Sequence, residues 1–162
     1  MYQVEIVKRP ARRVVGLEHR GAYDAIGGTF ERLGPAIEAM GLRPEAIELL
    51  AVYFDDPGEV AEADLRAVAG IAVRKGLALP EGFAEAKLAS GQHAVLTLAG
   101  PYDGLPAAWA WLYREWLPAS EFEARKAAPF EVYRNTPGEV APSELRTEIC
   151  VPVAKRRGLS RR

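Results

Sequence analysis

Residues that build metal and redox centres are scarce in this chain. The single cysteine, Cys150, cannot form an internal disulfide, and no paired-cysteine metal spacing is present. Only two histidines occur, His19 and His93, and we interpret both as structural residues of expected strands. Neither common glycine-rich phosphate-binding loop is found. We therefore expect no metal and no cofactor.

Long apolar runs are also missing. No stretch approaches the roughly 18 uncharged apolar residues of a spanning helix, and the charged, alternating start is unlike a signal peptide. We therefore expect a cytoplasmic protein that does not bind membranes. Five of the 21 cationic residues lie in a basic tail over 155–162, which leaves the rest of the chain acidic. Since phosphate affinity requires clustered Lys and Arg, we expect no direct binding to nucleic acid.

The chain does contain an internal repeat. The segment 52–73 returns without a gap as 132–153, and ten of the 22 aligned positions are identical. A period of about half the chain indicates a duplicated unit, because solenoids need three or more short repeats. We therefore expect a single domain over 1–154, built from half-repeats over about 1–75 and 82–154.

Each half has the same expected order of elements: strand, strand, helix, strand, strand. The strands are expected at 3–8, 13–20, 49–54, 66–73, 83–89, 92–99, 130–134 and 146–153, and the helices at 24–40 and 103–117. Asp24 and Asp103 can cap the helices, and Pro118 is expected to end the second one. These patterns predict an α+β fold with antiparallel sheets and pseudo-twofold symmetry. The interface between two packed halves is a common place for a ligand cleft.

The two copies differ at Glu148, which aligns with Val68. Strand alternation places Glu148 on the opposite face from Ile149 and Val151, which we expect to face the helices. A carboxylate in mid-strand is retained either because that face of the sheet is exposed to solvent or because the carboxylate binds a partner. A cationic ligand in an aromatic cleft is such a partner, whereas a solvated residue on the sheet face is the alternative.

Six pieces of the chain together resemble the gyrase-inhibitor-like (GyrI-like) family, which shares its domain with effector-binding regions of AraC-type and multidrug-responsive regulators. They are 21–24, 51–57, 90–95, Trp109, 130–135 and 145–153. The resemblance implies a tandem pair of strand-helix-strand-strand units with a ligand cleft between them. It also implies that the acidic residue of the family falls on Glu148, and the cleft aromatics on Trp109, Tyr53 and Tyr133. Cys150 departs from the pattern, because relatives often carry Tyr there.

Three functions are compatible with these residues. The leading hypothesis is a stand-alone small-molecule-binding protein that captures hydrophobic or cationic aromatic compounds and protects against xenobiotics. Glu148 would supply the charge, and Tyr53, Tyr133 and Trp109 the stacking walls. The alternative is a hydrolase of cyclopropane-bearing genotoxins with Glu148 as the catalytic acid or base. The second alternative is a DNA gyrase inhibitor, since the acidic body suits a basic partner surface.

Overall fold

The computed structural model describes residues 2–157 and divides the chain into two compact units. We call Ala11–Leu88 the contiguous unit, and Met1–Pro10 together with Ala89–Arg162 the composite unit. The expected α+β class with antiparallel strands is confirmed in each unit. Most of the expected basic tail, from residue 158 onward, lies outside the described residues.

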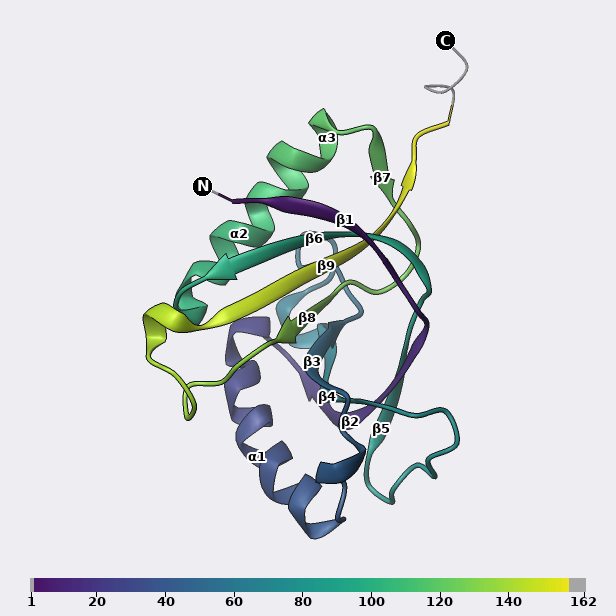
Figure 1. Ribbon diagram of the computed structural model, residues 1–162, viewed down its shortest axis with the longest axis vertical. Coiled ribbons are helices and arrows are strands. Elements are labelled where there is room, and N and C mark those ends of the chain that lie inside the picture. Colours follow the sequence, from purple (N-terminus) through teal and green to yellow (C-terminus); the bar gives the residue numbers. More distant parts are fainter. Residues whose placement is uncertain (1, 158–162) are drawn as a thin grey trace. The chain divides into compact units, whose positions relative to one another are not determined.

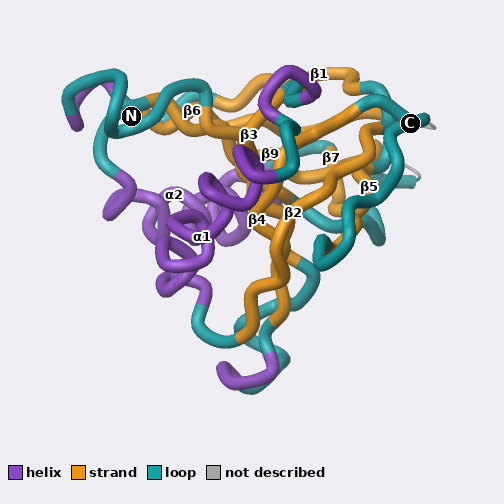
Figure 2. Tube along the Cα trace, turned by 90° about the horizontal axis from the view of Figure 1, so that it is seen from below, coloured by secondary structure: helices purple, strands orange, loops and turns teal. Residues whose placement is uncertain are grey.

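The contiguous unit is a four-stranded antiparallel sheet with one helix packed on it. Its strands, in sheet order, are β3 (Glu48–Tyr53), β4 (Arg66–Val73), β2 (Arg12–Arg20) and β5 (Ala84–Leu88). Helix α1 (Ile26–Ala39) packs on β2 and β4, which run side by side in Figure 2. Apolar residues of the strands and the helix end form the core beneath it, among them Val15, Ile71 and Leu42.

The composite unit repeats this arrangement. Its strands, in sheet order, are β1 (Val4–Arg9), β6 (Gly91–Ala99), β9 (Arg146–Lys155) and β8 (Phe130–Tyr133), and a short β7 (Phe122–Ala124) pairs with the end of β9. A helix formed by α2 (Leu105–Trp111), a π-type turn (Leu112–Trp116) and α3 (Leu117–Ala119) lies along this sheet (Figure 1). Leu112 and the core residues of β6 and β9 form one apolar cluster between helix and strands.

Strand registers agree between the two units. Tyr53 lies opposite Ala67 on β3 and β4, and Tyr133 lies opposite Thr147 on β8 and β9, which is the same pairing advanced by 80 residues. The helices begin at Ile26 and Leu105, 79 residues apart. This equivalence supports the duplication that the repeat predicts, and it gives most residues of one unit a counterpart in the other.

The edge strands do not follow the expected half-repeats. β1, the first strand of the first half, pairs with β6 of the second half. β5, the first strand of the second half, pairs with β2 of the first half. The chain therefore crosses between the units twice, after Pro10 and after Leu88, rather than once between the two expected half-repeats.

Two local expectations were wrong, and one strand was not expected. Neither helix has a side-chain cap, because Asp24 and Asp103 lie inside the single 3-10 turns that precede the helices. The second helix continues past Pro118 to Ala119. A proline ring clashes with the carbonyl four residues earlier, and the π-type turn just before Pro118 widens the helix at that place. Strand β7 was not expected, since its three residues are too short for a visible alternation.

Candidate functional site

The centre of the candidate site is Glu131, a carboxylate in the middle of β8 that is only 4% exposed. Its Oε2 accepts a hydrogen bond from the indole Nε1 of Trp109 at 2.5 Å, and its Oε1 accepts one from the hydroxyl of Tyr133 at 2.6 Å. Glu131 and Tyr133 are two residues apart on a strand, so they share the face that meets α2. Glu131 pairs with Ile149, which belongs to the core under that helix.

Aromatic rings surround this carboxylate. Trp109 stacks on Tyr113 with ring centroids 6.0 Å apart, and Tyr133 meets Tyr102 edge-on at 5.7 Å. Burial, and secondly the negative charge of Glu131, raise the pKa of Tyr102 above its usual value. Tyr113 is 37% exposed, so the group of rings reaches the surface there. We call Glu131 and these four rings the Glu131 site.

The chemistry of the Glu131 site favours a cation. Neutral donors such as an indole N–H and a phenol hydroxyl hold a carboxylate in place without cancelling its charge. The faces of Trp and Tyr rings carry negative potential and attract cations within about 6 Å. Among the described residues, no three His, Cys, Asp or Glu side chains are placed to hold a metal ion. The carboxylate and the ring faces together suit an organic cation with apolar substituents.

The contiguous unit lacks this constellation. The counterpart of Glu131 is Ala51, which is fully buried in β3, and the counterpart of Trp109 is Phe30. Tyr53, the counterpart of Tyr133, packs edge-on against the ring of Tyr23 at 4.8 Å. The shared architecture therefore does not require an acid at this position, and the carboxylate is a particular feature of the composite unit.

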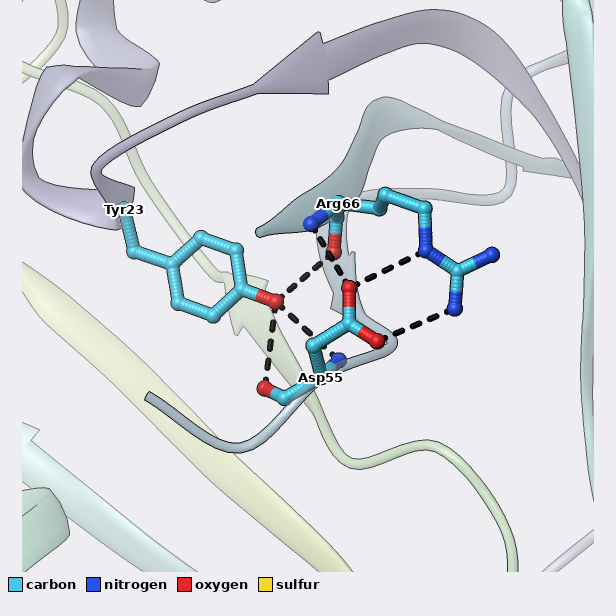
Figure 3. A network of polar contacts seen from close by, with 3 residues as sticks. All are labelled: Tyr23, Asp55 and Arg66. Carbon is cyan, nitrogen blue, oxygen red and sulfur yellow. Dashed lines mark hydrogen bonds and ion pairs between the residues drawn. The ribbon is translucent and has the colours of Figure 1, made fainter. Parts of the chain in front are cut away.

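The contiguous unit contains a polar network at the ends of β3 and β4 (Figure 3). The hydroxyl of Tyr23 donates to the backbone carbonyls of Asp55 at 3.1 Å and Arg66 at 2.7 Å. The carboxylate of Asp55 accepts the backbone N–H of Arg66 at 2.8 Å and two guanidinium hydrogen bonds at 3.0 Å each. In the composite unit the counterpart of Asp55 is Asn135, which accepts the backbone N–H of Arg146 at 2.8 Å but carries no charge. The network joins the ends of β3 and β4, and within it Asp55 is not surrounded by aromatic rings as Glu131 is.

We expect Asp55→Asn to destabilise the protein in a pH-dependent way. Hydrogen bonds from Arg66 hold the pKa of Asp55 below its usual value. The charged network therefore contributes stability above the unfolded pKa of about 3.9, and this contribution is lost as the pH falls through the lower folded pKa. Urea unfolding should show a less stable variant at about pH 7, and the difference should shrink toward about pH 2. A difference that stays constant over this range would contradict the charge-based account.

The structure brings together two of the four residues expected in the site. Trp109 and Tyr133 meet at Glu131. Glu148 lies on the other face of β9, where its Oε1 accepts a hydrogen bond from Arg134 at 2.7 Å and its side chain is 22% exposed. Tyr53 belongs to the contiguous unit and is 8% exposed. The expected roles of Glu148 and Tyr53 stay predictions.

Sequence reasoning missed Glu131 by one position. The ungapped repeat was aligned from Val52 and Val132, so the preceding pair, Ala51 and Glu131, fell just outside it. The test that singled out Glu148, an ionisable residue in one copy opposite an apolar one in the other, also selects Glu131. Extending the alignment by one residue would have supplied the signal.

Comparison with known proteins agrees with this architecture. The family model of the GyrI-like small molecule binding domain matches residues 2–154. A protein of Serratia proteamaculans named DNA gyrase inhibitor is 33% identical over 137 residues, which cover 82% of this chain and 86% of that protein.

Two solved structures share the fold. The C-terminal domain of EcmrR superposes with a TM-score of 0.75 at 19% identity, covering 96% of this chain and 99% of that one. SAV2435 bound to tetraphenylphosphonium superposes with a TM-score of 0.70 at 13% identity, covering 98% and 96%. Among the described residues, no helix combines the length and the apolar character needed to cross a membrane. The family model and the Serratia relative together show that this chain belongs to the GyrI-like small-molecule-binding family.

Proposed function

We propose that this protein captures hydrophobic or cationic aromatic compounds at the Glu131 site and protects the cytoplasm against xenobiotics. The observation that carries the proposal is a buried carboxylate held by Trp109 and Tyr133 within a group of four aromatic rings. Each cation–π contact contributes about 0.5–2 kcal/mol, depending on how far it is desolvated. The carboxylate adds charge complementarity in a region of low dielectric constant.

One structural relative has been solved with a ligand of the proposed class. The structure of SAV2435 was solved with tetraphenylphosphonium bound, and this lipophilic cation presents four phenyl groups around one positive charge. That protein is 13% identical to this chain, so the comparison extends only to the fold. The reason to expect such a ligand here is the chemistry of this chain's own acid and rings.

We assign the acidic role to Glu131 rather than to Glu148. A cation that approached Glu148 would compete with the guanidinium of Arg134, which already forms an ion pair at 2.7 Å. The indole of Trp109 and the phenol of Tyr133, which donate to Glu131, are themselves neutral. Both acids lie in the composite unit, so Glu148 offers a matched control for any variant of Glu131.

Titration with tetraphenylphosphonium tests the proposal. Trp109 is one of three tryptophans, and a ligand that stacks on it should change the intrinsic fluorescence in a saturable way. Isothermal titration should give one ligand per chain. Triphenylphosphine oxide has similar rings without the positive charge, and we expect it to bind about tenfold more weakly or worse. The proposal would be overturned if the cation showed no saturable binding up to about 1 mM. A dissociation constant of this size corresponds to a binding free energy of about −4 kcal/mol.

Inhibition of DNA gyrase is a second candidate function. It is favoured by the Serratia relative named DNA gyrase inhibitor, which is 33% identical to this chain. A supercoiling assay with purified gyrase tests it, with the Glu131→Gln variant added in parallel. Inhibition by both forms would indicate a protein-interaction surface separate from the Glu131 site, whereas no effect at large molar excess would exclude this function.

A further inference from the structure

A second polar group is buried next to the Glu131 site. Thr147, in β9, is fully buried, and within residues 2–157 nothing forms a hydrogen bond with its Oγ1. Thr147 lies directly opposite Tyr133, whose hydroxyl donates to Glu131. A buried hydroxyl without a hydrogen bond costs about 1–3 kcal/mol, so this residue is unfavourable for folding by itself.

The contiguous unit shows that the fold does not need this hydroxyl. The counterpart of Thr147 is Ala67, which is fully buried and lies opposite Tyr53 in the same register. The counterpart of Glu131 is also alanine, Ala51. The composite unit therefore carries two buried polar side chains, on neighbouring strands, at positions where the contiguous unit has two alanines. Glu131 accepts hydrogen bonds from Trp109 and Tyr133, whereas no group within residues 2–157 forms one with the Oγ1 of Thr147.

Sheet geometry brings these two groups to one place. Thr147 pairs with Tyr133 and Ile149 pairs with Glu131, so Thr147 and Glu131 are diagonal neighbours on the same face. Diagonal neighbours in an antiparallel pair are about 7–8 Å apart, and directly opposite residues about 4.5–5.5 Å. A ligand atom between the two side chains can contact both. A carboxylate accepts hydrogen bonds, and a threonine hydroxyl offers two lone pairs, so both groups can accept from one donor.

We infer that Thr147 is a second polar contact of the ligand, and that among lipophilic cations the site prefers a protonated amine bearing N–H groups to a quaternary cation. This inference rests on the proposed function, since it concerns the ligand of the same site. An ammonium N–H can donate to Thr147 while its charge faces Glu131. A quaternary ammonium or a phosphonium has no donor and leaves the hydroxyl unsatisfied.

A matched pair of ligands tests the inference. Dibenzylamine is protonated near neutral pH and carries two N–H donors, whereas dibenzyldimethylammonium has the same rings and charge but no donor. A hydrogen bond to a charged group contributes about 1.5–3 kcal/mol, which corresponds to about 10–100-fold in affinity. We expect Thr147→Val, which keeps the shape and removes the hydroxyl, to weaken dibenzylamine by about this factor. Its effect on dibenzyldimethylammonium should stay within about twofold.

Two further variants keep the test decisive. Thr147→Ser retains the hydroxyl and should bind dibenzylamine within about threefold of wild type. Thr147→Ala reproduces the residue of the contiguous unit and replaces the valine variant if that variant loses its circular-dichroism signal. The valine variant should melt at or above the wild-type temperature, because it removes an unsatisfied hydroxyl.

The outcomes separate this inference from the proposed function. If wild type binds neither ligand, both fail. If wild type binds both, and Thr147→Val and Thr147→Ala weaken both ligands equally or neither of them, the role of Thr147 is overturned while the Glu131 site stands. Selective loss of dibenzylamine in a folded variant supports the inference, because a merely structural threonine would not distinguish two ligands of the same charge and rings.

Discussion

Replacing Glu131 with glutamine is expected to weaken tetraphenylphosphonium binding by about 10–100-fold, or about 1.4–2.8 kcal/mol. Glutamine keeps nearly the same shape but has no charge, so the electrostatic attraction is lost while the rings stay available. Only one side-chain oxygen remains to accept from Trp109 and Tyr133. Isothermal titration of both proteins under the same buffer conditions measures the difference.

The matched control for this prediction is Glu148→Gln. It removes a carboxylate of the same unit that is ion-paired with Arg134, and we expect its effect on affinity to stay within about twofold. The neutral ligand triphenylphosphine oxide should not distinguish Glu131→Gln from wild type. If Glu148→Gln abolishes binding and Glu131→Gln does not, the acidic residue of the site is Glu148, as the family resemblance implied, and our assignment is wrong. Thermal melting of each variant shows whether a loss of affinity reflects a loss of fold.

The largest effect on stability is expected for Gly16→Ala, with a loss of about 3 kcal/mol or more. Gly16 on β2 lies opposite Gly70 on β4, in the middle of the contiguous unit. A Cβ added at Gly16 would stand 2.0 Å from the carbonyl oxygen of Ala69 and 2.5 Å from the Cα of Gly70. These are backbone atoms, so the two central strands would have to separate. In the composite unit the equivalent pair is Val95 and Cys150, which shows that this close approach is particular to one unit.

Gly28→Ala provides the control for this second prediction. Gly28 lies in α1, and apart from its chain neighbours and the backbone of its own helix no atom lies within 4 Å of the place where its Cβ would stand. Alanine is favoured over glycine in a helix by about 0.5–1 kcal/mol, so this variant should be equally stable or more stable. Urea unfolding of both variants gives the comparison. Equal stability of Gly16→Ala and wild type would show that the strands accommodate a methyl group and would contradict the close contact.

The sequence predicted where strands and helices lie along the chain better than it predicted which strands pair with each other. Periodicity located eight of the strands and both helical segments, because hydrophobic alternation is a local signal. The pairing of β1 with β6 could not be predicted in this way, since it joins residues about 90 positions apart. It depends on which edge strand of a sheet still has unpaired backbone groups. The π-type turn before Pro118 has no sequence signal of its own.

In the candidate site, too, single residues could be predicted from the sequence, but their contacts could not. Tyr133 could be selected from the sequence because it matches Tyr53 in the visible repeat, and the family resemblance selected Trp109 as well as Tyr133. Their convergence on Glu131 depends on which face of β8 meets α2, and this is a property of the packed unit. Alternation did place Ile149 and Val151 toward the helix as expected. The orphaned hydroxyl of Thr147 could only be found once its neighbours were known.

The exchange of edge strands has a consequence for synthesis on the ribosome. β1 is made before its neighbour β6, which begins only at Gly91, so β1 must wait for its partner strand. All strands of the contiguous unit lie within Ala11–Leu88, and this unit can form while β6 is still being translated. The nascent chain would therefore carry an unpaired amino-terminal segment through most of its elongation, and unpaired strands are exposed to aggregation. Chaperone dependence should fall if β1 were moved by circular permutation to follow β9.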